Sequence, residues 1–101
     1  MSEETNELFE SGARKLRKSI EETELKVEQS KEDLQDLEKA SERANTTLQF
    51  ANNLYTNALG ATASLKGESG LGVINDIMES RDRAEDLYNK TEKLLKKMRG
   101  E

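Results

Sequence analysis

The sequence lacks several of the residue types on which enzyme chemistry and compact cores depend. It contains no Cys and no His, so disulfides, thiol chemistry, the commonest general base and the commonest transition-metal ligand are excluded. Trp is also absent, and aromatic residues make up 4% of the chain, which leaves few large side chains to fill a globular core. We therefore expect no enzymatic activity, no cofactor, no metal site and no small-molecule substrate.

Long apolar segments are missing as well. No run of apolar residues is long enough to cross a bilayer, and the acidic start over residues 1–5 is unlike a signal peptide. We therefore expect no membrane insertion. These features favour the cytoplasm but leave the compartment unknown. The net charge of −5 at pH 7 argues against nucleic acid as a partner.

An unbroken heptad pattern is the main feature that the sequence does contain. Uncharged residues recur at alternating spacings of four and three from Phe9 to Thr62, although 37% of the chain is charged. Pro, the strongest helix breaker, is absent. This repeat is typical of a coiled coil and predicts one long helix over residues 5–63. Its seam consists of Phe9, Ala13, Leu16, Ile20, Thr23, Val27, Ser30, Leu34, Leu37, Ser41, Ala44, Leu48, Ala51, Tyr55, Ala58 and Thr62.

A glycine-rich segment over residues 64–71 interrupts the pattern and predicts a turn. A second heptad pattern follows, so we expect a shorter helix over residues 72–99 that runs antiparallel to the first. Pairing large with small seam residues favours a register that places Arg99 near Glu38. The expected fold is all-α, a single coiled-coil hairpin over residues 1–101. Its core is formed by Ala44, Leu48, Ala51, Leu54, Tyr55, Ala58, Ile74, Ile77, Ala84, Leu87, Tyr88, Leu95 and Met98.

The hairpin leaves part of the long seam without a partner. In the preferred register the shorter helix reaches only to about Ser41, so the seam from Phe9 to Leu37 has no partner within the chain. An isolated amphipathic helix of this length is marginally stable in water. We therefore expect another molecule to cover it, either a second copy or another helical protein.

The charges beside the seam favour a second copy in antiparallel orientation. A parallel dimer would oppose Lys26 to Lys31, whereas an antiparallel dimer opposes Lys26 to Asp33. The expected assembly is an elongated homodimer with helical-bundle ends. Its predicted interface consists of Phe9, Ala13, Leu16, Ile20, Thr23, Val27, Ser30, Leu34 and Leu37, flanked by Arg17, Glu24, Lys26, Lys31, Asp33 and Glu38.

Other motifs have simpler interpretations. The glycines over residues 67–72 resemble a phosphate-binding loop, but the strand that such loops follow is absent, so we interpret them as a turn. The basic run over residues 14–18 is followed at once by acidic residues, and we interpret it as a solvated helix face. Polar seam residues such as Thr23, Ser30 and Thr91 have two interpretations: they set register and partner choice, or they only lower stability.

The function predicted from the sequence is therefore structural. The leading hypothesis is a non-enzymatic coiled-coil interaction protein that acts as a dimerisation module, spacer or docking scaffold. One alternative is a hairpin chaperone or tether that clamps client helices with the uncovered seam. Another is one strand of a heteromeric cytoskeletal or extracellular coiled coil.

Overall fold

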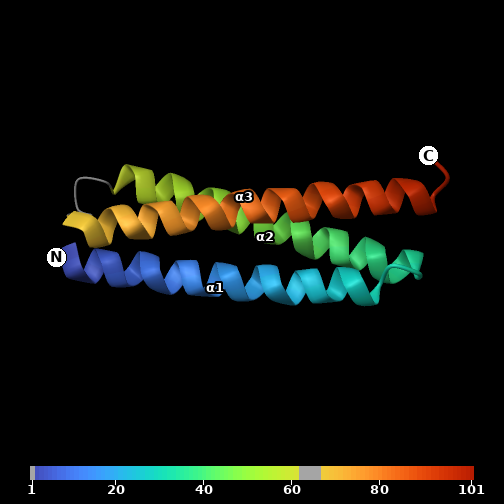
Figure 1. Ribbon diagram of the computed structural model, residues 1–101, viewed down its shortest axis with the longest axis horizontal. Helices are drawn as coiled ribbons and strands as arrows, with labels where there is room; N and C mark the ends of the chain where they lie inside the picture. Colours follow the sequence, from blue (N-terminus) through green and yellow to red (C-terminus); the bar gives the residue numbers. More distant parts are fainter. Residues whose placement is uncertain (1, 62–66) are drawn as a thin grey trace.

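A computed structural model describes residues 2–61 and 67–101 of the protein. This described part consists mainly of three helices. Helix α1 spans Ser2–Gln29, α2 spans Leu34–Gly60 and α3 spans Gly67–Met98. They lie side by side along the long axis of a body measuring 51 × 20 × 16 Å (Figure 1). Because the chain reverses twice, α2 is antiparallel to both of its neighbours. The all-helical fold and the packing of helices against one another agree with the sequence pattern.

The predicted continuous helix over residues 5–63 is wrong, because the chain turns back at residues 30–33. The Ser30 hydroxyl donates to the Lys26 carbonyl (2.6 Å), and the Asp33 backbone N–H donates to the Ser30 carbonyl (3.1 Å). Asp33 has extended backbone angles and caps α2, since its side chain accepts from the Asp36 backbone N–H at 3.1 Å. Asp is among the preferred N-cap residues, and this cap supplies a partner for an N–H that a helix start leaves unpaired.

Closure at this turn gives the uncovered seam a partner within the chain. The seam side chains of α1 pack against α2 and α3, and Leu16 and Ile20 are fully buried. The alanines of α2 at positions 40, 44, 51 and 58 are also buried, and their small size lets both neighbours approach closely. Each fully buried Leu or Ile contributes about 1.5–3 kcal/mol, which outweighs the modest entropy of closing a short loop.

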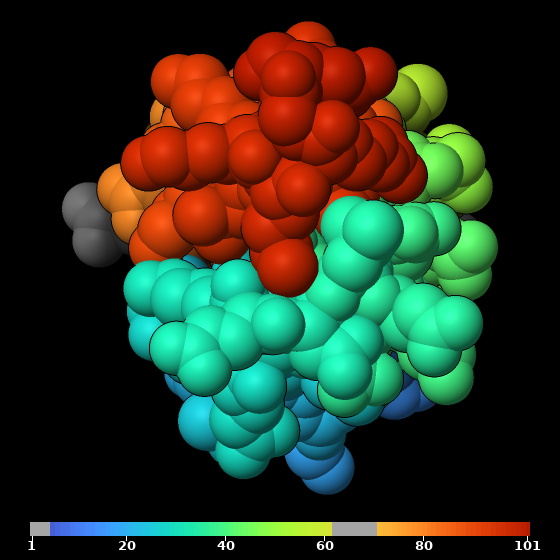
Figure 2. All heavy atoms as spheres, turned by 90° about the vertical axis from the view of Figure 1, so that its right-hand side faces the viewer, coloured from blue at the N-terminus to red at the C-terminus, as the bar shows by residue number. Residues whose placement is uncertain are grey.

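The core consists of two clusters. One lies toward the N-terminus of α1 and contains Phe9, Ala13, Ala58, Val73 and Ile77. The second extends toward the α1–α2 turn and includes Leu16, Ile20, Val27, Leu37 and Leu95. Figure 2 looks onto that end, where the turn lies beside the last residues of α3.

The start of the last helix also differs from its prediction. The sequence predicted a turn over residues 64–71 and a helix from residue 72, but α3 begins at Gly67, and residues 62–66 lie outside the described part. Glycine lowers helix propensity by only about 1 kcal/mol per residue, and tertiary packing overrides such preferences. Val73 is buried in the core cluster that contains Phe9, which holds the first turns of α3 in place.

Candidate docking surface

The second half of α2 presents an uncharged surface on a highly charged molecule. No Asp, Glu, Lys or Arg occurs from Ala44 to Gly60, whereas the part of α2 before Ala44 contains both acidic and basic residues. The exposed side chains of this half are mostly amides and hydroxyls, joined by Phe50 and Leu59, which are 42% and 49% exposed. Depletion of charged residues together with exposed aromatic residues is the compositional signature of a protein interface.

A shallow groove runs along this surface between α1 and α2. It consists of two adjoining hollows of about 380 and 250 Å³, which share Lys15 and Phe50. We call this the α1–α2 groove. It is lined by Leu8, Phe9, Ser11, Gly12, Lys15 and Ser19 from α1 and by Thr46, Thr47, Phe50, Leu54 and Asn57 from α2.

The chemistry of the groove is apolar with one positive charge. Leu8 is 68% exposed and stands on the opposite wall from Phe50. Lys15 is the single charged side chain among the described residues that line the groove. One cation and no described anion line the groove, whereas the molecule as a whole carries a net charge of −5.

Gly12 brings the two walls of the groove close together. A Cβ at this position would lie 2.8 Å from Leu54 Cδ1 and 3.3 Å from Leu54 Cδ2. The missing side chain therefore lets Leu54 lie directly against the backbone of α1. Further along, the Ser19 and Thr47 hydroxyls are 2.8 Å apart and form a hydrogen bond between the same two helices.

The residues predicted to form a dimer interface are mostly inside the bundle. Leu34 is half-buried, and the other seam residues are buried: Phe9, Ala13, Leu16, Ile20, Thr23, Val27, Ser30 and Leu37. They contact other helices of the same chain. The side chains predicted to contact a second molecule therefore contact other helices of their own molecule.

The charged residues beside that seam pair mainly within the chain. Arg17 on α1 forms an ion pair with Asp76 on α3, and Glu24 on α1 pairs with Arg83 on α3 (2.5 Å). Lys31 pairs with Glu28 of its own chain at 2.9 Å. This lysine, mainly through its hydrogen bond and also through its charge, holds the pKa of Glu28 below its ordinary value.

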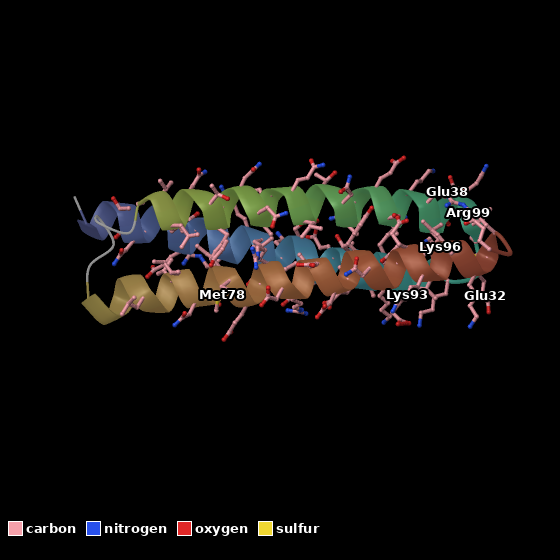
Figure 3. The ribbon with its side chains drawn as sticks, turned by 90° about the horizontal axis from the view of Figure 1, so that it is seen from above. Glu32, Glu38, Met78, Lys93, Lys96 and Arg99 are labelled. Carbon is pink, nitrogen blue, oxygen red and sulfur yellow. The ribbon has the colours of Figure 1, made fainter. Side chains whose placement is uncertain are left out.

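The end of α3 carries the pair that the preferred register brought together. Arg99 Nη2 lies 3.9 Å from Glu38 Oε2, and Figure 3 shows the two side chains together where α3 ends. Lys26 is half-buried, and Asp33 caps α2 as described above. None of these exposed pairs contributes more than a few tenths of a kcal/mol, so they orient the helices rather than stabilise them.

The residues assigned to the hairpin core differ in burial. Ala44, Ala51, Ala58, Ile77, Ala84, Leu87 and Leu95 are buried, while Leu48, Leu54, Tyr55, Ile74 and Tyr88 are half-buried. Met98, the last residue of α3, is 37% exposed. The sequence pattern could not show this, since a heptad position does not tell how much of a side chain its neighbours cover.

Three polar seam residues, Thr23, Ser30 and Thr91, form local hydrogen bonds, each to a carbonyl of the preceding helical turn. The hydroxyls of Thr23 and Thr91 donate to the carbonyls four residues earlier, both at 2.7 Å. Ser41 is different, because its hydroxyl donates across helices to Glu92 Oε1 at 2.6 Å. Arg81 lies over the Tyr55 ring, with its guanidinium carbon 4.6 Å from the ring centroid.

Other surface hollows have a different character. One of about 610 Å³ between α1 and α3 is lined by both acidic and basic residues, including Glu10, Arg14 and Asp76. Within the described residues no three acidic side chains cluster in a way that could hold a metal ion. None of the described helices has an apolar stretch long enough to span a membrane.

Comparison with known proteins gives no relative for this chain. No protein-family model matches it, and neither a curated protein nor a solved structure does. The groove is therefore interpreted from its own residues. The signal for it was present in the sequence as the charge-free stretch after Ala44, but only the fold shows that Leu8 and Gly12 lie beside that stretch.

Proposed function

We propose that the protein is a non-enzymatic docking scaffold that holds an amphipathic helix of a partner protein in the α1–α2 groove. The observation that carries this proposal is the partly apolar groove, whose described lining contains one charged residue, Lys15, on a chain of which 37% is charged. Exposed Leu8 and Phe50 have no role in the core of the bundle, so their burial by a partner would contribute favourably.

The groove chemistry specifies the partner. Two antiparallel helices form a trough that suits a third helix, which would present apolar side chains at spacings of three and four residues. Lys15 lies where the two hollows meet, so an acidic residue near the middle of the partner helix would complement it. A partner with an acidic, apolar face is thus preferred over a basic one.

A display library of amphipathic helical peptides tests the proposal directly. Peptides selected on the protein should combine apolar anchors at helical spacing with an acidic residue, and Phe50→Asp should weaken their binding by ten- to a hundredfold. Lys15→Glu should select against the acidic peptides. The matched control is Leu25→Asp, because Leu25 is 59% exposed and does not line the groove. Equal binding to the Phe50 and Leu25 variants would contradict the proposal.

Self-association into an elongated homodimer is a second candidate function. The observation that favours it is the seam, which keeps its spacing through Val27, Ser30, Leu34 and Leu37 although the chain turns there. A clamp for client helices would need this seam exposed. In the closed bundle it is buried, so we favour docking in the groove over clamping.

A further inference from the structure

The turn between α1 and α2 has a sequence that also fits a continuous helix. Residues 30–33 are Ser-Lys-Glu-Asp, without Gly or Pro, and Lys and Glu are good helix formers. Among the described residues other than glycine, none has a positive φ, so the turn requires no special residue. The Asp33 cap and two backbone bonds, from Ser30 N–H to the Val27 carbonyl and from Asp33 N–H to the Ser30 carbonyl, hold it.

The buried face also continues through the turn. Val27 and Ser30 at the end of α1 and Leu34 and Leu37 at the start of α2 keep the spacing of three and four residues. If the turn becomes helical, these side chains therefore stay on one face of a single helix from Ser2 to Gly60. The same sequence supports a closed bundle and an open rod.

An open chain would expose the core that α1 covers. Leu16, Ile20 and Val27 are each at most 2% exposed in the bundle and would all be left in water. The surface that fits them best is the one they have just left, on the α2–α3 hairpin. A second open copy presents that surface unchanged.

We infer that two copies associate by exchanging α1. This inference rests on the self-association proposed above and specifies the interface of that dimer. Each α1 packs on α2 and α3 of the other copy, and the ion pairs Arg17–Asp76, Glu22–Arg43 and Glu24–Arg83 re-form between molecules. No contact of the closed bundle outside the turn is lost.

The facing residues of α1 and α2 fix the geometry of this dimer. Gly12 meets Leu54, Ser19 meets Thr47 and Glu22 meets Arg43, so the numbers of facing residues add to 65 or 66. When this pairing runs between two antiparallel copies, its two-fold axis lies near residue 33, within or next to the turn. The exchange is thus symmetric, as a closed dimer of identical chains requires.

A disulfide between Ser19 and Thr47 positions distinguishes exchange from every other mode of pairing. Their hydroxyl oxygens are 2.8 Å apart on α1 and α2, and the chain contains no Cys that could interfere. The Ser19→Cys/Thr47→Cys double variant is first unfolded in denaturant and then refolded at about 1 mM, which is in the range of the effective concentration of a tethered helix. The refolded monomer and dimer are separated by size. The dimer fraction is then oxidised.

In an exchanged dimer the two cysteines that face each other belong to different chains. The oxidised dimer should therefore remain a covalent dimer on a denaturing, non-reducing gel, while the oxidised monomer fraction should run as monomer. A dimer that falls apart into monomers after oxidation would overturn exchange but leave self-association standing. Absence of any dimer at this concentration, in the wild type and in the Asp33→Ala variant, would overturn both.

Variants of the turn provide a matched pair with opposite effects. Asp33→Ala removes a cap that exists only in the closed form, twice per dimer, and should lower the dimer dissociation constant roughly thirtyfold. Lys31→Gly/Glu32→Gly should raise it roughly a thousandfold, because four glycines per dimer then oppose the continuous helix. If both variants shifted the constant in the same direction, the helical turn would not be the hinge.

Discussion

Replacement of Gly12 by Ala tests whether the Leu54 side chain can move to make room for an added methyl group. The added methyl group removes a glycine from the interior of α1, which stabilises a helix by about 1 kcal/mol. It would also lie 2.8 Å from Leu54 Cδ1, so Leu54 has to move. Leu54 is half-buried and lines the hollow of about 380 Å³, into which its side chain can turn at a cost of about 0.5 kcal/mol.

The gain therefore outweighs the cost, and we expect Gly12→Ala to stabilise the protein by about 0.5 kcal/mol, or about 2–4 °C in Tm. Urea denaturation followed by circular dichroism measures the effect. In a Leu54→Ala background the cost disappears, and the same substitution should add about 1 kcal/mol. Gly60→Ala is the control without a neighbouring side chain, since no atom beyond its chain neighbours and the backbone of its own helix lies within 4 Å of the added Cβ.

Destabilisation by Gly12→Ala that is equally large with and without the Leu54 side chain would contradict this prediction. Such a result would show that the close contact lies with the backbone of α2 and not with a movable side chain. If Leu54 turns as expected, it partly fills the α1–α2 groove. Gly12→Ala should then also weaken the peptides selected on the wild type, although the fold is more stable.

Three further predictions concern the core and the turn. Ile20→Ala should lower the free energy of unfolding by about 2–5 kcal/mol in urea denaturation, because Ile20 is fully buried in the larger core cluster; a loss below about 1 kcal/mol would contradict that packing. Thr91→Val should change stability by less than about 1 kcal/mol in the same assay, because the Thr91 hydroxyl bonds only to the Leu87 carbonyl of its own helix; a larger loss would reveal a role in register. Lys31→Gln should raise the pKa of Glu28 toward its ordinary value in an NMR titration. Because the pKa of Glu28 is lowered on folding, the ionised Glu28 side chain stabilises the protein above the unfolded-state pKa, and this stabilisation is lost as pH falls through the folded-state pKa. The Lys31→Gln variant should therefore lose less stability on acidification.

Helix content and the buried face could be predicted from the sequence with little ambiguity. The spacing from Phe9 to Ala58 identifies the residues that avoid water, because a helix places every third or fourth residue on one side whatever covers that side. The charge-free stretch after Ala44 was equally visible. The sequence did not show whether this stretch is buried or exposed, since an uncharged helix face can lie inside a bundle or form part of its surface.

The turn at residues 30–33 shows where the sequence pattern reached its limit. Asp33 followed by Asp36 is a helix-start signal, but the uninterrupted seam from Val27 to Leu37 argued against a break. Local preferences are worth about 1 kcal/mol here, and both the open and the closed form satisfy the heptad pattern. Burial within one chain of Leu16, Ile20 and Val27 results from tertiary packing, which local sequence signals do not predict.

The residue pattern alone specifies amphipathic helices with one continuous apolar seam, because side-chain periodicity is a property of the helix alone. What covers that seam depends on how the three helices pack together. By folding α1 back onto α2 and α3, the chain turned a predicted intermolecular interface into a core, because a tethered helix reaches its partner at lower entropic cost than a separate molecule does. The same fold placed Leu8 and Gly12 beside Phe50, which created a groove that no stretch of sequence shows on its own.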